Sequence, residues 1–162
     1  MSLINHRRRS ARWHGASQKV RQSAAPLFLD RIDIQCEITP VPFKDISKAA
    51  PGEPSANIRE RVIKAREIQA ARYKDYKGIH CNAQMTERMI HQFAEPNEAG
   101  IDMLRMAMEK LSLSARAYSR ILKVARTIAD LEGCEHVELH HLAEAIGYRA
   151  LDRGDWAERG HI

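Results

Sequence analysis

Residues 113–133 read LSARAYSRILKVARTIADLEG, and this stretch decides the fold. Apolar residues recur along it every three or four positions, which is the period of a helix with one buried face. The apolar stripe contains Tyr118, Ile121, Leu122, Ala125, Ile128 and Ala129. We therefore predict a single helix that packs its striped face against a core.

Both ends of this helix carry boundary signals. Ser114 is suited to N-cap the helix through its hydroxyl, and Gly133 stands where a left-handed C-cap residue belongs. The face opposite the stripe carries Arg116, Arg120, Lys123 and Thr127. Because a guanidinium offers a rigid fork of donors, an arginine in the first turn is well placed to hold a phosphate. The alternative, which periodicity alone favours, is an ordinary solvated basic face.

The rest of the chain is expected to be mainly α-helical. We predict further helices over about 55–73, 83–93, 96–111 and 140–151, joined by short loops as in a small bundle. In the first of these, Ser55 is expected to be the N-cap, with Ile58 and Val62 on an apolar seam.

One short strand is predicted before the bundle. Residues 32–38 read IDIQCEI, an alternation of apolar and polar residues that is typical of a strand. One strand cannot pair with itself, so we expect it to have no sheet partner in this chain. The domain organisation is then an irregular basic tail (1–25), the strand and a linker (26–54), the helical domain (55–153) and a polar tail (154–162).

The net charge of +5 comes from one end of the sequence. Six basic residues and no acidic one precede Pro26, namely Arg7, Arg8, Arg9, Arg12, Lys19 and Arg21. Such a tail can attract nucleic acid or a membrane surface, although a tail without a specific partner is the reading we favour. No apolar run approaches the roughly 20 residues that span a bilayer, so no membrane partner is expected.

The cysteines and histidines give little sign of metal chemistry. The three cysteines (Cys36, Cys81 and Cys134) are far apart, which argues against a disulfide framework or a zinc ribbon and fits a reducing cytoplasm. Three histidines (His136, His140 and His141) lie near Cys134 and Glu138, and histidines four apart can share a helix face. No second ligand pair accompanies them, so we expect no metal site.

Nucleotide-hydrolysis motifs are also missing from the sequence. It contains no Gly-x-x-x-x-Gly-Lys-Ser/Thr phosphate loop and no apolar run ending in paired acids that could hold magnesium. The chain is therefore not expected to bind and hydrolyse ATP alone by the usual route.

Several segments together resemble one protein family. They are LDRIDI (29–34), GEPSANIRERV (52–62), NAQ (82–84), the LSARA run that begins at Leu113, and HLAEAIGYR (141–149). In this order they resemble the magnesium-chelatase-like family of AAA+ ATPases, and its competence-associated branch in particular, over about residues 26–153. The resemblance implies the last strand of an ATPase core followed by a helical lid domain.

The resemblance also implies roles for three arginines. Arg31 matches an arginine finger that acts in trans on a neighbouring subunit's nucleotide, where a guanidinium steadies the transferring phosphoryl group. Arg116 matches the lid's phosphate-sensing arginine, and Arg120 is its possible support. The family usually reads Ser-Gly-Pro-Leu-Leu-Asp-Arg, whereas residues 23–31 read SAAPLFLDR, which bears on the placement of Arg31. The structural alternative for Arg31 is a surface ion pair with Asp30 or Asp33.

The intact protein implied by this resemblance is a cytoplasmic homo-oligomeric ring that uses ATP and Mg²⁺, with no membrane partner. The competence branch is associated with DNA remodelling, and the chelatase branch inserts magnesium into porphyrin. In this chain Arg116 is expected to be exposed and unpaired, with no cofactor bound by the chain alone. The alternative function is a free-standing helical nucleic-acid-binding module that uses the basic tail and the arginine face.

Overall fold

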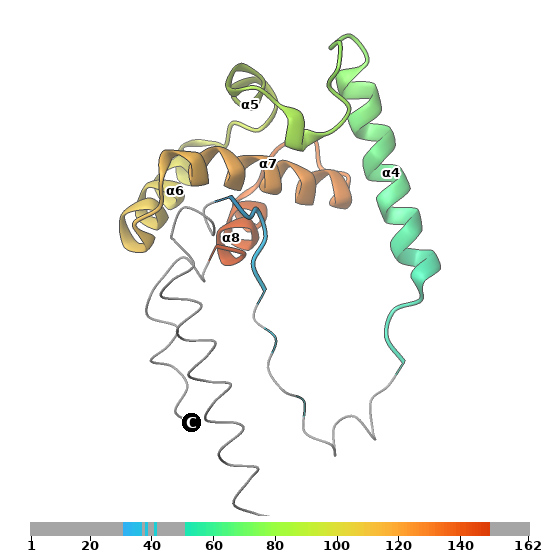
Figure 1. Cartoon of the computed structure of the whole chain (residues 1–162), viewed down its shortest axis with the longest axis horizontal. Helices are drawn as coiled ribbons and strands as arrows, with labels where there is room; N and C mark the ends of the chain where they lie inside the picture. Colours follow the sequence, from blue (N-terminus) through green and yellow to red (C-terminus); the bar gives the residue numbers. More distant parts are fainter. Residues whose placement is uncertain (1–30, 37, 39–40, 42–50, 150–162) are drawn as a thin grey trace, which may run out of the picture.

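The computed structural model describes residues 31–36, 38, 41 and 51–149. This part of the chain holds five α-helices, with one 3₁₀ helix, η1, between the first two (Figure 1). The elements are α4 (Ser55–Tyr73), η1 (Asn82–Gln84), α5 (Glu87–Phe93), α6 (Glu98–Leu111), α7 (Ala115–Glu132) and α8 (Leu139–Gly147). The predicted mainly helical fold is confirmed over these residues.

Helix α7 lies at the centre of the bundle and contacts α4, η1, α5 and α8 (Figure 1). Its predicted stripe is buried, since Ile121, Leu122, Ala125, Ile128 and Ala129 are each at most 8% exposed, although Tyr118 is only half-buried. Its predicted boundaries are also confirmed. The Ser114 hydroxyl accepts a bond from the Ala117 amide, and Gly133 takes a left-handed φ of 75°. Periodicity and caps therefore agree on this helix, and α4, α5 and α8 pack against it, while α6 packs against α8.

Helices α5 and α6 begin at side-chain caps. The Thr86 hydroxyl accepts from the Met89 amide, and the Asn97 side chain accepts from the Gly100 amide. The helix predicted over 83–93 is in fact two elements, because the backbone turns extended at Met85, where η1 ends and before α5 begins. Helix α6 approaches α8 so closely that a Cβ on Gly100 would lie 2.8 Å from Leu142 Cδ1.

Helix α4 matches its predicted bounds but not its predicted packing. Its N-cap position is Pro54, with no side-chain cap bond, so Ser55 is the first helical residue and not the cap. The expected seam residues Ile58 and Val62 are 43% and 46% exposed. Only the C-terminal part of α4 is buried, because its N-terminal half projects away from the other helices (Figure 1).

The predicted strand is not present in the described residues. Residues 31–36, which we call the strap, run irregularly past α7 and α8 (Figure 1), and Ile38 is also outside any strand. The described part of the chain offers them no strand partner, and two of their backbone groups bond instead to the residues that follow α8. The Gln35 amide donates to the Tyr148 carbonyl oxygen at 3.0 Å, and the Ile32 carbonyl accepts from the Arg149 side chain.

Helix α8 ends at Gly147, earlier than the predicted end near residue 151. The predicted tails, 1–25 and 154–162, lie outside the described residues. Among the residues that are described, no helix is both long enough and apolar enough to cross a membrane.

Candidate functional site

A groove of about 610 Å³ opens beside the N-terminal half of α7. Its lining comprises Asp33 from the strap, Ala83 from η1, Glu87 from α5, and Ala115, Arg116, Tyr118, Ser119, Arg120 and Lys123 from α7. The buried stripe fixes the rotation of α7, and this turns its basic face toward the groove. The two arginines predicted on this face are therefore brought together, with Lys123 beside them.

Arg116 lies in the first turn of α7 and is exposed, as predicted. It is not unpaired, because it makes a polar or electrostatic interaction with another residue. The expectation of an unpaired Arg116 was therefore wrong. The guanidinium nevertheless lines the groove, where a ligand can reach it.

Arg120 is one turn further along α7, and the strap holds it. Its guanidinium donates to the Arg31 carbonyl oxygen at 2.6 Å and forms an ion pair with the Asp33 carboxylate. The Arg120 side chain is 25% exposed and that of Asp33 is 53% exposed, so the pair is open to water. Arg120 is therefore not a free solvated side chain, because its guanidinium is already bonded to the strap.

The remaining charged groups of the groove are held by neighbouring elements. The Lys123 ammonium donates to the Ala83 carbonyl oxygen at 3.1 Å. The Ser119 hydroxyl donates to the Glu87 carboxylate, with distances of 2.9 and 3.0 Å to its two oxygens. The lining therefore contains three cations and two carboxylates, which leaves one net positive charge. Such a groove favours an anion.

Arg31 lies at the start of the strap with an exposed side chain. Its backbone carbonyl accepts the bond from Arg120, which places the strap's first residue beside the groove. The alternative prediction was an ion pair between Arg31 and Asp33. The ion pair observed for Asp33 is instead with Arg120. Asp30 lies outside the described residues.

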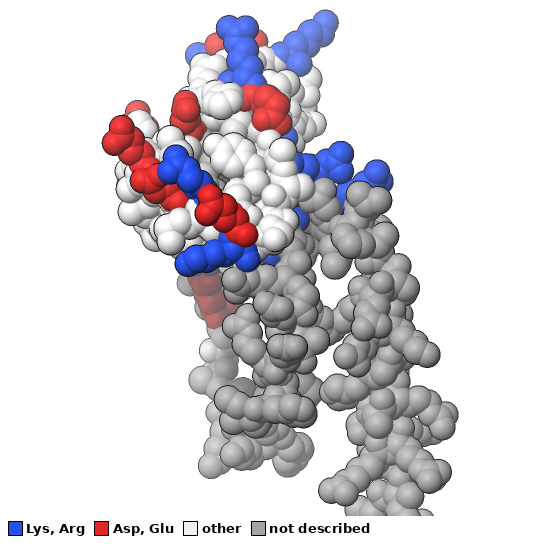
Figure 2. Space-filling view, turned by 90° about the vertical axis from the view of Figure 1, so that its left-hand side faces the viewer, with Lys and Arg blue, Asp and Glu red and all other residues white. Residues whose placement is uncertain are grey.

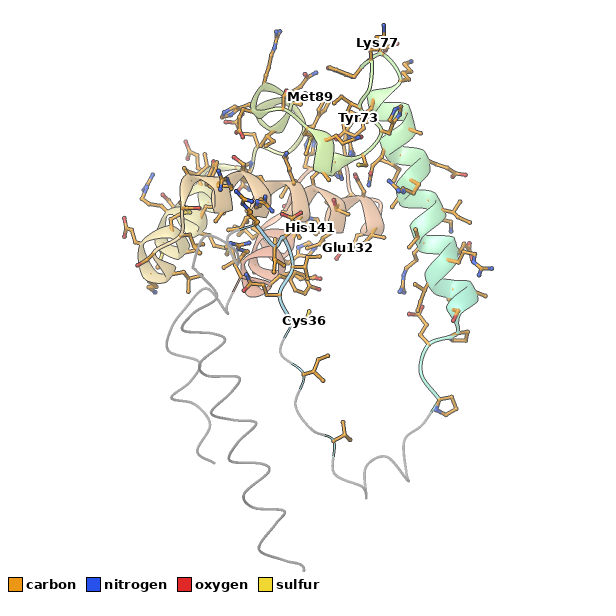
Figure 3. All side chains as sticks on the ribbon, in the orientation of Figure 1. Cys36, Tyr73, Lys77, Met89, Glu132 and His141 are labelled. Atoms are coloured by element: carbon orange, nitrogen blue, oxygen red, sulfur yellow. The ribbon has the colours of Figure 1, made fainter. Side chains whose placement is uncertain are left out.

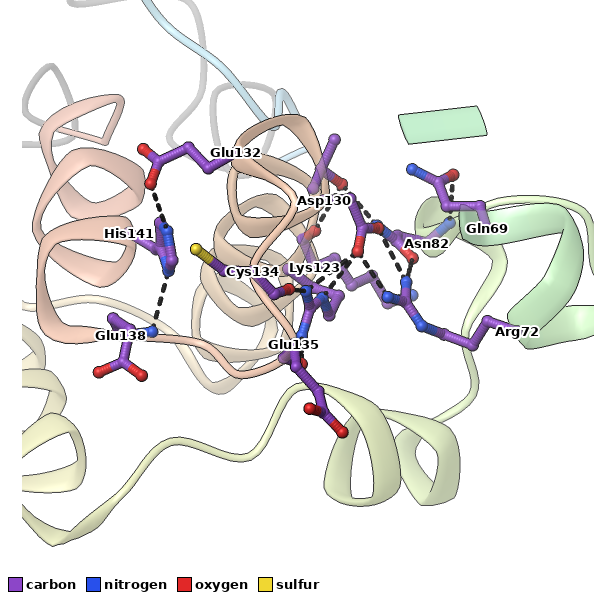
Figure 4. Close-up of polar contacts among 12 residues, drawn as sticks. Gln69, Arg72, Asn82, Lys123, Asp130, Glu132, Cys134, Glu135, Glu138 and His141 are labelled. Atoms are coloured by element: carbon purple, nitrogen blue, oxygen red, sulfur yellow. Dashed lines mark hydrogen bonds and ion pairs between the residues drawn. The ribbon is translucent and has the colours of Figure 1, made fainter. Parts of the chain in front are cut away.

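A buried ion network that sequence reasoning missed joins α4 to α7 (Figure 4). The Asp130 side chain is fully buried and accepts two bonds from Arg72, at 2.5 and 2.8 Å, and one from Asn82 at 2.7 Å. Arg126, only 1% exposed, donates to Asp130 at 3.1 Å and to the carbonyl oxygens of residues 134 and 135. The signal available in the sequence was the spacing of Arg126 and Asp130, four apart among the apolar residues of α7.

The pKa of Asp130 shows which effect dominates in this network. Burial alone would raise the pKa of its carboxyl, but hydrogen bonds from Arg72 and Asn82 and the charge of Arg126 hold that pKa below its usual range. Burial lowers the pKa of Arg126. Asp130 is thus an ionised group surrounded by donors, and its role is to hold helices together.

The histidines considered above as possible metal ligands form a group with a different membership. Its members are Glu132, His140 and His141, whose ligand atoms all lie within 4.8 Å of one another. Glu132 and His141 lie close together below α7 (Figure 3), and Figure 4 marks the contact between them. The Nε2 atoms of His140 and His141 lie 2.9 and 3.0 Å from the same Glu132 oxygen. These contacts hold the pKa of Glu132 below its usual range.

The protonation of His141 limits what this group can bind. The Glu138 amide donates to His141 Nδ1 at 2.9 Å, which forms part of the cap of α8 (Figure 4). A backbone N–H can only donate, so Nδ1 of neutral His141 is unprotonated and Nε2 carries the proton. Nε2 then donates to Glu132 and has no lone pair for a metal. The geometry therefore favours a hydrogen-bonded cap over a three-ligand metal site.

The cysteines form no disulfide. Cys36 is exposed, Cys81 and Cys134 are partly buried, and all three are free thiols. They contribute no ligand to the groove.

The match to a protein-family model shows the class of protein. Residues 52–149, which are more than half of the chain and contain all of its described helices, match the family model described as "Magnesium chelatase, subunit ChlI C-terminal". The chain therefore belongs to the magnesium chelatase-like family, as the C-terminal part of such a protein. The resemblance noted in the sequence is confirmed.

Particular relatives place the chain near the competence-associated branch. It is 43% identical over 127 residues to the competence protein ComM of Haemophilus influenzae, an alignment that covers 78% of this chain and 24% of ComM. It is 41% identical over 127 residues to the uncharacterized protein YifB of Salmonella typhimurium and of Escherichia coli, with the same coverage. The chain thus spans about a quarter of the length of the curated relatives it matches.

Proposed function

We propose that this chain is the lid-like helical domain of a magnesium chelatase-like AAA+ ATPase and that its α7 groove receives nucleotide phosphate. The observation that carries the proposal is the convergence of Arg116, Arg120 and Lys123 on one groove within the region that matches the family. An anion bound in the groove would lie against a lining that carries all three cations, and charge-assisted bonds from arginine are strong and directional.

Arg116 is the residue proposed to contact the phosphate. It lies in the first turn of α7 and is exposed. The buried face of α7 fixes the side of the helix on which Arg116 lies. Arg120 is proposed as support, since its guanidinium already holds a carboxylate in the same groove. Arg31 is proposed to act in trans, as an arginine-finger-like residue on a neighbouring subunit's nucleotide.

The wider proposal concerns the longer protein to which such a domain belongs. That protein would bind ATP and Mg²⁺ through an upstream phosphate loop, assemble as a homo-oligomeric ring in the cytoplasm, and remodel DNA. The similarity to ComM, a competence protein, supports the choice of DNA over porphyrin. The domain itself would report the state of the nucleotide and contribute contacts between subunits.

A chimera tests this function. Residues 52–149 of this chain replace the matching segment of ComM, and ATP hydrolysis is compared between Arg116→Ala and Arg105→Ala versions. Arg105 is the matched control, an exposed α6 arginine paired with Asp102 and absent from the groove. We expect Arg116→Ala to lose turnover, because it removes a phosphate contact. Equal rates in the two chimeras would contradict the sensing role.

A free-standing nucleic-acid-binding module remains the second candidate. The observation that favours it is the basic tail, which carries six basic and no acidic residues before Pro26. On the face of the bundle seen in Figure 2, basic and acidic side chains are interspersed over the described part, so that face offers no broad basic surface. DNA binding that falls steeply with salt and is lost on removal of residues 1–25 would favour this candidate.

A further inference from the structure

The strap is attached to the bundle by four contacts, two with α7 and two with the residues that follow α8. Arg120 of α7 binds the Arg31 carbonyl and the Asp33 carboxylate, which are 89 and 87 residues away in sequence. At the end of α8, the buried Arg149 side chain donates to the Ile32 carbonyl, and the Tyr148 carbonyl accepts from the Gln35 amide. The segment that carries Arg31 is thus anchored directly on the helix that carries the groove.

Asp33 occupies the groove in the manner of a bound anion. Its carboxylate lines the groove and pairs with Arg120, one of the groove's two arginines. Carboxylates and phosphates bind the same guanidinium fork. A phosphate that engages Arg120 must therefore compete with Asp33 for that side chain.

The charges of the groove set the direction of this competition. With Asp33 in place the lining has three cations and two carboxylates, and without Asp33 it has three cations and one carboxylate. The groove is more positive once the strap has left, so an anion binds the open state more tightly. The Arg120–Asp33 pair is half-open to water, and pairs of this kind contribute little stability. Displacing the Asp33 carboxylate from Arg120 therefore costs little, and full release of the strap must in addition break its bonds to Tyr148 and Arg149.

From these contacts we infer that Asp33 is a built-in competitor for the phosphate site and that phosphate binding in the groove releases the strap. The inference rests on the proposed phosphate site and adds its regulation. Because binding equilibria are reciprocal, strap docking weakens phosphate binding by the same factor by which phosphate weakens strap docking. The state of the groove is thereby coupled to the position of Arg31, at the strap's first residue.

The experiment uses the full chain and tripolyphosphate as the probe. The dissociation constant is measured for the wild type, Asp33→Asn, Arg116→Ala and Asp102→Asn. Asp102 is an exposed α6 carboxylate paired with Arg105, so Asp102→Asn changes the net charge equally without touching the groove. Amide exchange at Gln35, whose N–H bonds Tyr148, reports strap docking in the same samples.

We expect Asp33→Asn to bind tripolyphosphate about 5-fold more tightly or better, and Asp102→Asn to match the wild type. Tripolyphosphate should also accelerate Gln35 amide exchange in the wild type. Equal affinity of wild type and Asp33→Asn, with Gln35 exchange unchanged, would overturn the competition while leaving the phosphate site intact. Absence of binding to every variant, or binding that is insensitive to Arg116→Ala, would instead overturn the phosphate site itself.

Discussion

Replacing Asp130 by asparagine tests the buried network that joins α4 to α7. The Asp130 side chain is fully buried, and that of Arg126 is 1% exposed. The substitution keeps the shape but removes the negative charge, leaving the Arg72 and Arg126 guanidinium groups without their counter-ion. It also turns an amide NH₂ toward donors from Arg72, Arg126 or Asn82, because each of these groups donates to Asp130.

The expected cost follows from breaking a buried pair by removing one partner, about 3–5 kcal/mol. That is a large share of the roughly 5–15 kcal/mol by which native domains are stable. Urea denaturation followed by circular dichroism measures it. Asp102→Asn is the control, since its 2.8 Å ion pair with Arg105 is exposed, with both side chains at least 64% accessible. The control should change the free energy of unfolding by less than about 1 kcal/mol. A loss below about 1 kcal/mol for Asp130→Asn would refute the network's role.

The same network gives the stability a defined pH dependence. The folded-state pKa of Asp130 is lowered, chiefly because hydrogen bonds from Arg72 and Asn82 outweigh the opposing effect of burial. A lowered pKa contributes stability that is fully present above the unfolded value, about 3.9, and is lost as pH falls through the folded value. As the pH falls from about 5 toward about 1, the free energy of unfolding should therefore decrease more for the wild type than for Asp130→Asn. Parallel pH profiles of the two proteins would count against this assignment.

Three further predictions follow from packing and from the missing motifs. Ile121→Ala removes a core side chain that is 1% exposed and should cost roughly 2–5 kcal/mol in denaturant unfolding, whereas less than about 0.5 kcal/mol would mean that the wrong face of α7 is inside. Gly100→Ala should destabilise by about 1–3 kcal/mol, because its Cβ would lie 2.7 Å from Pro96 Cβ, whereas Gly147→Ala meets nothing within 4 Å and should not. The purified chain should not hydrolyse ATP above background, and turnover that survives repurification and is abolished by Arg116→Ala would contradict this.

Helix α7 was predictable because three independent signals agree along it. The apolar period, the Ser114 cap and the Gly133 stop each depend only on residues that are near in sequence. The same local signals placed Arg116 and Arg120 on one face, since residues four apart on a helix are neighbours. This part of the candidate site could therefore be read from the sequence.

The strap was not predictable as it stands, because its structure depends on distant partners. The alternation in residues 32–38 indicates a strand only if another strand pairs with it, and the described part of the chain supplies none. Asp33 and Arg120 are 87 residues apart in the sequence, so no local sequence pattern predicts their contact. The exposed first half of α4 has the same origin, since helical periodicity reports which face is apolar but not whether anything covers it.

The buried pair of Arg126 and Asp130 escaped prediction for a different reason. Charged residues are rarely buried, so a core position was not expected for either residue. They are buried because they bond to each other and because Arg72, 58 residues away in the sequence, and Asn82 donate to Asp130 as well. The spacing of such a pair is visible in a sequence. The distant donor that offsets the cost of burying the pair is not.

The central claim is that the α7 groove is a phosphate site built around Arg116. Its most direct test is a tripolyphosphate titration of the full chain, followed residue by residue by NMR, for the wild type, Arg116→Ala and the control Arg105→Ala. We expect saturable binding with shifts at residues 115–123 and at Asp33, loss of that binding in Arg116→Ala, and wild-type behaviour in Arg105→Ala. Shifts scattered over the basic surface, or groove shifts of equal size in Arg116→Ala, would contradict it.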